Sequence, residues 1–242
     1  MHFRFITLLA AATMLAACGD KADIPSGVDP NQPFGRFRFV NAVADSAAAA
    51  NRVNVRVDGV PLGVSLAYGA AAPATSYLIA YQGARNFLVQ QTADTAAHVL
   101  DEDVTITADT TQTVYATIEG GSVTTFVTLD DLTLPGADSV KIRLVNLAPS
   151  AGNVDVYVTA VGADISTMAP TVADMAPSSA SEYLRLKRGT WQVRFTTAGT
   201  KTVVRSVNVA PPSGSAPYIR TVVVLDPVPP ATALTSAVLT DR

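Results

Sequence analysis

The sequence predicts an all-β protein with two tandem immunoglobulin-like β-sandwich domains, which follow a signal peptide and a flexible tether. Three observations support this: short blocks of residues recur in the second half of the chain, apolar and polar residues alternate at period two, and turn signals are frequent. No long stretch keeps helical spacing. Residues 34–134 are expected to form the first sandwich repeat, and residues 137–242 the second.

Five blocks recur in the same order in the two halves. They are Arg38–Asn41 with Arg143–Asn146, Val53–Val57 with Val154–Val158, Tyr77 and Gly83 with Tyr183 and Gly189, Thr117 with Thr221, and Leu129 and Asp131 with Leu239 and Asp241. One such match could arise by chance between two β-rich stretches. Five matches in one order predict a duplicated unit.

The alternation within these blocks predicts half-buried strands, because successive side chains of a strand point to opposite faces. Phe37 and Phe39 alternate with Arg36 and Arg38, Ile142 and Leu144 with Lys141 and Arg143, and Trp191, Val193 and Phe195 with Gln192 and Arg194. The fully apolar run Val222–Leu225 instead predicts a central strand covered on both faces. Turns are expected at Asp58-Gly59, Gly120-Gly121, Pro135-Gly136 and Pro211-Pro212, which gives about seven or eight strands per repeat.

Residues 1–17 are expected to be a signal peptide. Arg4 precedes the apolar run Phe5–Leu15, which is too short to span a bilayer. The tetrapeptide Leu15-Ala16-Ala17-Cys18 resembles the bacterial lipobox. That resemblance implies cleavage before Cys18 and lipid attachment to it, which makes the protein a bacterial cell-envelope lipoprotein. A buried, inert Cys18 is the alternative.

Residues 18–33 are expected to form the lipidated cysteine and a flexible linker, because they are rich in Asp, Pro, Gly and Ser. Fully extended, the linker could reach about 50 Å, so the first domain need not touch the bilayer. Gly19 follows the cysteine, where the lipoprotein sorting rule uses Asp for retention in the inner membrane. The resemblance therefore favours the outer membrane, on either its periplasmic or its surface face.

A second resemblance covers most of the chain after the linker. Arg38–Asn41, Val53–Gly59, Leu66–Gly69, Tyr77 and Gly83 resemble the bacterial domain of unknown function 4397, which often occurs in lipoproteins and in tandem, and the same outline runs from Arg143 to Gly189. Where that family tends to show Ser-Pro-Asp, the two repeats have Val43-Ala44-Asp45 and Ala148-Pro149-Ser150. The resemblance implies a fold and an envelope context, and it implies no activity.

Composition and motifs exclude several functions. With 17 basic and 20 acidic residues the net charge is −3, which offers no electrostatic footprint for nucleic acid. Cys18 is the only cysteine, so no internal disulfide or structural zinc site is expected, and no cofactor motif is present. His98, the last histidine, is expected in a solvated loop before Asp101-Glu102-Asp103. These acids and Asp130-Asp131 could bind calcium, but solvation in loops is the preferred interpretation.

Three further groups have structural and functional interpretations. Asn41 and Asn146 recur at strand ends, where capping of a turn is favoured over ligand binding. Core packing is favoured over a glycan platform for the aromatic residues Tyr68, Tyr77, Tyr81, Tyr183 and Trp191. A soluble strand face is favoured over a polymer-binding patch for the basic residues Arg185, Lys187, Arg188, Arg194 and Arg205.

The predicted function is a lipid-anchored, non-enzymatic binding or structural module of the cell envelope, with an envelope protein or polysaccharide as partner. The alternative is an envelope glycan-active enzyme or accessory subunit that uses loop carboxylates in a cleft. The two repeats are also expected to fold independently and to join at Leu134–Ala137, where the repeat register restarts.

Overall fold

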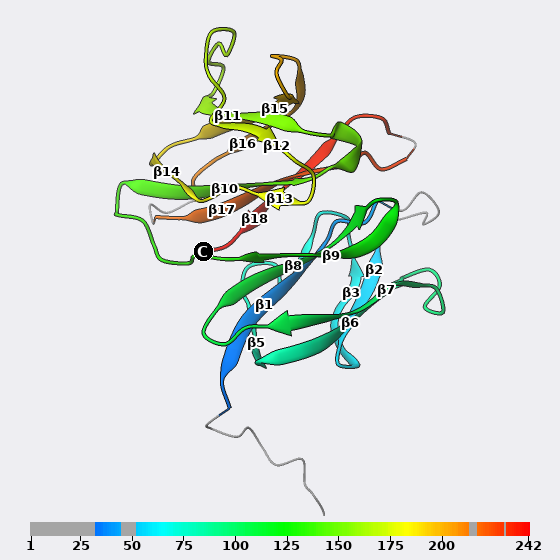
Figure 1. Ribbon diagram of the computed structural model, residues 1–242. Coiled ribbons are helices and arrows are strands. Elements are labelled where there is room, and N and C mark those ends of the chain that lie inside the picture. The colour runs from blue at the N-terminus through cyan, green and yellow to red at the C-terminus, as the bar shows by residue number, and fades with distance from the viewer. Residues whose placement is uncertain (1–31, 45–51, 213–216, 230) are drawn as a thin grey trace, which may run out of the picture. The chain divides into compact units, whose positions relative to one another are not determined.

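The computed structural model of the protein describes residues 32–44, 52–212, 217–229 and 231–242. The expected signal peptide, Cys18 and most of the expected linker lie outside these ranges. Within them the chain forms β-strands and one short 3-10 turn, which confirms the predicted all-β class (Figure 1). None of the described segments is a helix long and apolar enough to cross a membrane.

The first half of the described chain forms two sheets. Its strands are β1 (Phe34–Asn41), β2 (Val53–Val57), β3 (Val60–Leu66), β4 (Ala71–Ala72), β5 (Leu78–Tyr81), β6 (Gly83–Gln91), β7 (His98–Ile106), β8 (Thr111–Glu119) and β9 (Ser122–Leu129). One sheet has the order β4-β1-β8-β9, with β5 also paired to β1, and the other has the order β3-β2-β6-β7. The predicted turns at Asp58-Gly59 and Gly120-Gly121 join β2 to β3 and β8 to β9, with all four residues at positive φ.

The second half repeats this pairing pattern. Its elements are β10 (Ser139–Leu147), the 3-10 turn η1 (Pro149–Ala151), β11 (Val154–Ala160), β12 (Val172–Met175), β13 (Ser179–Ala180), β14 (Leu184–Lys187), β15 (Trp191–Thr197), β16 (Val203–Val209), β17 (Ile219–Leu225) and β18 (Thr235–Thr240). The sheets have the orders β13-β10-β17-β18, with β14 also paired to β10, and β12-β11-β15-β16. Each half thus has nine described strands, more than predicted, because two short strands share one neighbour.

The pairing registers correct two of the expected residue matches. In the parallel pair β1 and β8, Arg38 lies opposite Thr113, and in the parallel pair β10 and β17, Arg143 lies opposite Thr221. Thr113, and not Thr117, is therefore the counterpart of Thr221. The neighbouring antiparallel pairs place Thr128 and Leu239 in equivalent positions, which makes Asp130, and not Asp131, the counterpart of Asp241.

Each half has a core between its own two sheets. In the first half, Phe37 and Phe39 of β1 pack against Phe87 of β6, with ring centroids 5.5 and 6.3 Å from it. In the second half, Ile142 and Leu144 of β10 pack in the same cluster as Phe195 of β15. This arrangement confirms the predicted sandwich packing.

A third core joins the outer faces of the two five-stranded sheets. Val40 and Tyr115 of the first half pack in one buried cluster with Val145, Val223 and Leu239 of the second. Both faces of β1 and β10 are consequently buried along most of their length. The prediction that these two strands are half-buried was wrong, because the period-two pattern cannot show that a second sheet covers the polar face. β17 is central and buried, as its apolar run predicts.

Candidate functional site

The third core contains a buried group of charged residues that connects the two halves. Arg38 has no solvent exposure, and its guanidinium forms an ion pair with Asp241 and donates to the carbonyl oxygen of Thr240 at 2.8 Å. Its Nε donates to Thr113 Oγ1 at 2.9 Å. Asp130 lies 3.9 Å from the same guanidinium. An arginine of the first half is therefore neutralised mainly by a carboxylate of the second.

Arg143 makes the reciprocal contacts. Its Nη2 lies 2.6 Å from Asp130 Oδ1 and donates to Thr221 Oγ1 at 3.2 Å. Its Nη1 donates to the carbonyl oxygen of Leu129 at 2.8 Å. The arginine of the second half is thus neutralised by a carboxylate of the first. We call Arg38, Asp130, Arg143 and Asp241 the crossed ion pairs.

Two tyrosines flank the crossed ion pairs at equivalent positions. Tyr77 lies 4.8 Å from the Arg38 guanidinium and donates to Asp130 at 2.7 Å. Tyr183 lies 4.8 Å from the Arg143 guanidinium, with its hydroxyl 3.5 Å from Asp241. Burial, and then the neighbouring carboxylates, raise the pKa of both tyrosines well above the usual value of 10.

The electrostatics of this group fit a structural joint. Burial alone would lower the pKa of Arg38, but Asp241 and the other facing groups raise it, so the guanidinium stays charged. Both tyrosines keep their protons at neutral pH, because their pKa values are raised. Each arginine pairs with a carboxylate of the other half, so the group links the two sheets through buried ion pairs.

The family-like motif Leu66–Gly69 also contacts the second half. The Tyr68 hydroxyl donates to the carbonyl oxygen of Asp226 at 3.0 Å. Gly69 has a φ of +74°, and a Cβ at this position would lie 3.3 Å from Leu225. The positive φ favours glycine at this position, where the two halves approach each other closely.

The acidic residues after His98 do not form the predicted loop. His98–Ile106 is strand β7, in which Asp101 and Asp103 point to one side and contact Asn86 of β6 at 2.8 and 3.2 Å. Glu102 points to the other side and accepts from the backbone N–H of Thr125 at 3.1 Å. Asp101 and Asp103 remain exposed to solvent, so these two acidic side chains lie on the outer face of the strand, and of the three acids Glu102 alone turns inward.

Asp131 is also engaged within the protein. Its carboxylate accepts from Lys141 Nζ at 2.5 Å, and this bond lowers the pKa of Asp131 to about 2. Asp130, Asp131 and Arg242 line a hollow of about 490 Å³ beside the crossed ion pairs. Each of these two aspartates has a cation partner, Asp130 in Arg143 and Asp131 in Lys141. In the described ranges, no three His, Cys, Asp or Glu residues gather as a metal site would need.

The two repeated asparagines cap turns, as predicted. Asn41 Oδ1 accepts from the backbone N–H of Val43 at 3.2 Å, and Asn146 Oδ1 accepts from that of Ala148 at 3.1 Å. Both side chains are buried. They fix the chain direction at the ends of β1 and β10.

The predicted aromatic and basic groups are dispersed. Tyr77 and Tyr183 flank the crossed ion pairs, whereas Trp191 Nε1 donates to the Lys187 carbonyl oxygen at 2.8 Å. Arg185 and Lys187 lie on β14 in one sheet, while Arg194 and Arg205 lie in the other. Neither group forms one surface.

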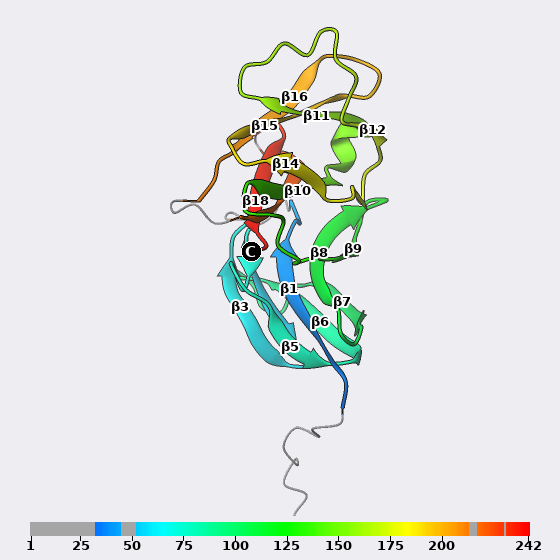
Figure 2. The same cartoon turned by 90° about the vertical axis from the view of Figure 1, so that its left-hand side faces the viewer.

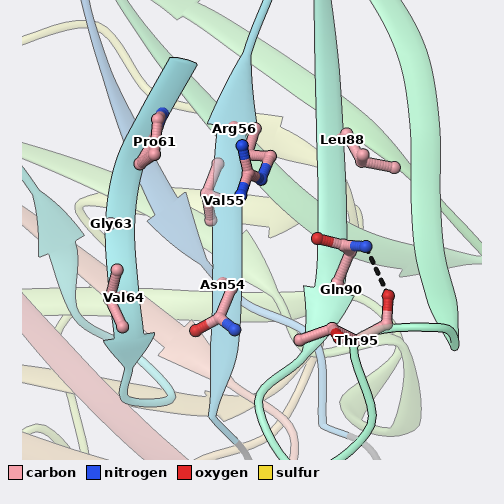
Figure 3. Close-up of a pocket in the computed structure, with 9 residues that line it drawn as sticks. All are labelled: Asn54, Val55, Arg56, Pro61, Gly63, Val64, Leu88, Gln90 and Thr95. Atoms are coloured by element: carbon pink, nitrogen blue, oxygen red, sulfur yellow. Dashed lines mark hydrogen bonds between the residues drawn. The ribbon is translucent and has the colours of Figure 1, made fainter. Parts of the chain in front are cut away.

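A groove of about 390 Å³ lies on the first half, over β2, β3 and β6 (Figure 3). Its polar side chains already have partners in the protein. Asn54 Oδ1 accepts from the backbone N–H of Ser65 at 2.9 Å, Arg56 donates to the carbonyl oxygen of Gly59 at 2.9 Å, and Gln90 donates to that of Thr95. The lining contains no aromatic side chain.

The network and these hollows were not predicted from the sequence. Arg38 and Arg143 were recognised as repeated residues, but they were placed on solvent faces. One signal in the sequence could have indicated the buried ion pairs: each repeat has an arginine in its first strand and an aspartate at its end.

These features define an all-β protein whose paired sheets are joined by buried ion pairs. A family model matches residues 35–157, just over half of the 242-residue chain. The chain belongs to the family described as domain of unknown function (DUF4397). The match continues past Leu134–Ala137 into β10 and β11, so its limit differs from the predicted repeat boundary.

A search of curated proteins finds no match. Among solved structures, the chain is similar to a family 41 carbohydrate-binding module from streptococcal virulence factors, described in a study of alpha-glucan recognition. The TM-score is 0.30 and the identity 8%, over 86% of this chain and 97% of that one.

Two further solved structures show similarity of the same order. A family CBM26 module from Eubacterium rectale Amy13K, solved with maltoheptaose, has a TM-score of 0.28 and 12% identity over 86% of this chain and 97% of that one. The Bacillus anthracis TIE protein has a TM-score of 0.24 and 9% identity over 80% of this chain and 34% of that one. Similarities this low carry no functional argument.

Proposed function

We propose that the protein is a lipoprotein anchored through Cys18 in the bacterial cell envelope, where it acts as a non-enzymatic binding or structural module. The observation that carries the non-enzymatic part is the engagement of the three carboxylates in and beside the crossed ion pairs. Asp130 and Asp241 are committed to the crossed ion pairs, and Asp131 to Lys141. A catalytic carboxyl instead needs a raised pKa or an open approach to substrate.

The module consists of two tandem copies of the family's domain, of which the second starts at β10. Support comes from the matching strand order of the two halves and from the equivalence of Arg38 and Arg143, each opposite a threonine on a parallel strand. The reciprocal ion pairs add to this support, because one duplicated unit facing its own copy would generate them.

The anchor is proposed from the sequence pattern around Cys18, and the outer membrane is the proposed location. The partner is an envelope protein or polysaccharide, which meets the exposed outer sheets and loops. The glycan-active alternative has no specific support in the contacts of the described carboxylates.

Two measurements test this proposal. Mass spectrometry of the membrane fraction should find acyl groups on Cys18, and Cys18→Ala should leave the protein soluble or uncleaved, with Met14→Leu as a matched control in the same segment. A Cys18→Ala protein that stays membrane-bound after signal removal would refute the anchor. Incubation with purified peptidoglycan or lipopolysaccharide should show no turnover, whereas release of glycan fragments that depends on Glu102 or Asp131 would establish the enzyme alternative.

A further inference from the structure

Exposed apolar side chains gather at one end of the first half. Phe34 is 45% exposed, Val60 66%, Leu78 41% and Ile79 65%. We call these four residues the tether-end patch. Val60, Leu78 and Ile79 line an apolar hollow of about 280 Å³ between β3 and β5, and Phe37 also lines it. Tyr81, which pairs with Phe34, also lines this hollow, and exposed apolar side chains grouped in this way usually mark an interaction site.

Backbone contacts place this patch where the linker joins the first sheet. The backbone N–H of Gln82 donates to the Pro33 carbonyl oxygen at 2.9 Å, and Phe34 pairs with Tyr81 at the end of β5. Figure 2 shows β5 beside the start of β1. Fifteen residues before Pro33 lies Cys18, the proposed lipid attachment point. The patch therefore surrounds the point from which the chain leads to the anchor.

The second half shows that the fold does not require an apolar surface here. Pairing registers make Phe34 equivalent to Ser139, Ile79 to Arg185 and Tyr81 to Lys187. The equivalent strand, β14, thus carries the charges that protect most exposed sheet edges from unwanted contacts. The same architecture tolerates polar residues at the positions of Phe34 and Ile79, so these two apolar residues of the first half call for a different explanation.

Cationic side chains flank the patch. Arg36 lies directly opposite Ile79 in the sheet, and Arg36 and Arg56 are both exposed. Asp58 is neutralised by Arg85 at 3.1 Å, and Arg85 also donates to the Tyr81 carbonyl oxygen at 3.1 Å. Guanidinium groups beside apolar side chains match a lipid surface, where the former meet phosphates and the latter enter the boundary with the acyl chains.

We propose that the tether-end patch docks on the lipid surface of the bilayer that holds the Cys18 anchor. This inference rests on the proposed lipoprotein function. A linker of roughly 15 residues can reach about 50 Å, so the anchor alone would leave the first half free of the membrane. Docking of the patch gives the first half a defined orientation on the membrane, with the end that carries Pro33 against the lipid.

The test uses the full acylated protein in vesicles of phosphatidylethanolamine and phosphatidylglycerol. An Ile79→Cys variant carries an environment-sensitive fluorophore, because acylation leaves the substituted position with the only free thiol. Val203→Cys on β16 is the matched control, since Val203 is a valine with 44% exposure in the second half. Brominated acyl chains should quench the label at position 79 several-fold more than the label at position 203.

A second variant tests the cause. Ile79→Glu, which places a carboxylate within the patch, should abolish the quenching of a label at Val60→Cys while acylation and membrane retention are unchanged. Equal quenching at positions 79 and 203 in acylated, vesicle-bound protein would overturn the docking proposal and leave the lipoprotein proposal intact. Absence of acyl groups by mass spectrometry, with no retention of any variant, would instead overturn the lipoprotein proposal on which it rests.

Discussion

Arg38 on β1 forms a buried ion pair with Asp241, 203 positions later in the chain. The reciprocal pair joins Arg143 to Asp130. Each half of the molecule thus holds the counter-charge for the arginine of the other. This relationship accounts for polar residues in strands that are otherwise apolar.

Replacement of Arg38 should destabilise the protein strongly. Arg38→Leu leaves Asp241 buried without its main partner, and loss of one member of a buried pair costs about 3 to 5 kcal/mol. The matched control is Arg36→Leu on the same strand, where the side chain is exposed and the cost should stay within about 0.5 kcal/mol. Urea unfolding measures both variants. Similar losses for the two would show that the ion pair does not stabilise the joint.

Tyr115→Phe should increase stability. The Tyr115 hydroxyl is buried and has no hydrogen-bond partner among the described residues, and burial raises its pKa to about 12. Removal of an unsatisfied polar atom should raise the free energy of unfolding by about 1 kcal/mol. Tyr77→Phe is the contrasting variant, because its hydroxyl donates to Asp130 and its loss should be destabilising. A decrease in thermal stability for Tyr115→Phe would show that the hydroxyl has a partner in solution.

Asp131 should make stability depend on acid pH. Its pKa in the folded protein is lowered from 3.8 to about 2, mainly by the bond to Lys141, so its contribution is fully present above about pH 4. The contribution is lost as the pH falls from about 4 to about 2, because protonation then favours the unfolded chain. The difference in unfolding free energy between the protein and Asp131→Asn should shrink across this window. If the difference in unfolding free energy stayed constant across this window, the bond between Asp131 and Lys141 would not be its source.

The two halves should associate when they are produced separately. Independent folding of residues 33–134 and 137–242 stays a prediction, which cooperative melting of each piece would test. Val40 of the first half and Val223 of the second pack in one cluster. Separation of the two pieces therefore exposes an apolar face with unpaired charges on each. Mixed in equal amounts, they should form a one-to-one complex by ultracentrifugation, and Arg38→Leu should weaken it. Two stable pieces with no affinity would contradict the role of the third core.

Prediction from sequence succeeded where the signal is local. Positive-φ turns such as Asp58-Gly59 and the apolar run Val222–Leu225 were placed correctly, since a turn residue or a doubly buried strand is encoded by its neighbours. The burial of Arg38 could not be predicted in the same way. An alternating strand identifies two faces, and only the contacts of a distant segment decide whether the polar face meets water or a counter-charge.

The acidic strand β7 illustrates the same limit. Asp101 and Asp103 were expected in a solvated loop, but they lie on a strand, where Asn86 of the neighbouring strand donates a hydrogen bond to each. The tether-end patch also escaped prediction, since its members come from three strands that only pairing brings together.

The crossed ion pairs impose an order on how the protein matures. A chain emerging from its amino-terminal end can pack Phe37 and Phe39 against Phe87 early, but Arg38 has no ion-pair partner from the second half until Asp241 has emerged. The first sandwich therefore lacks this ion pair until the second half has folded against it. A truncated chain that ends before β18 would expose Arg38 without its ion-pair partner on an apolar sheet face. Quality-control proteases and chaperones engage surfaces of this type.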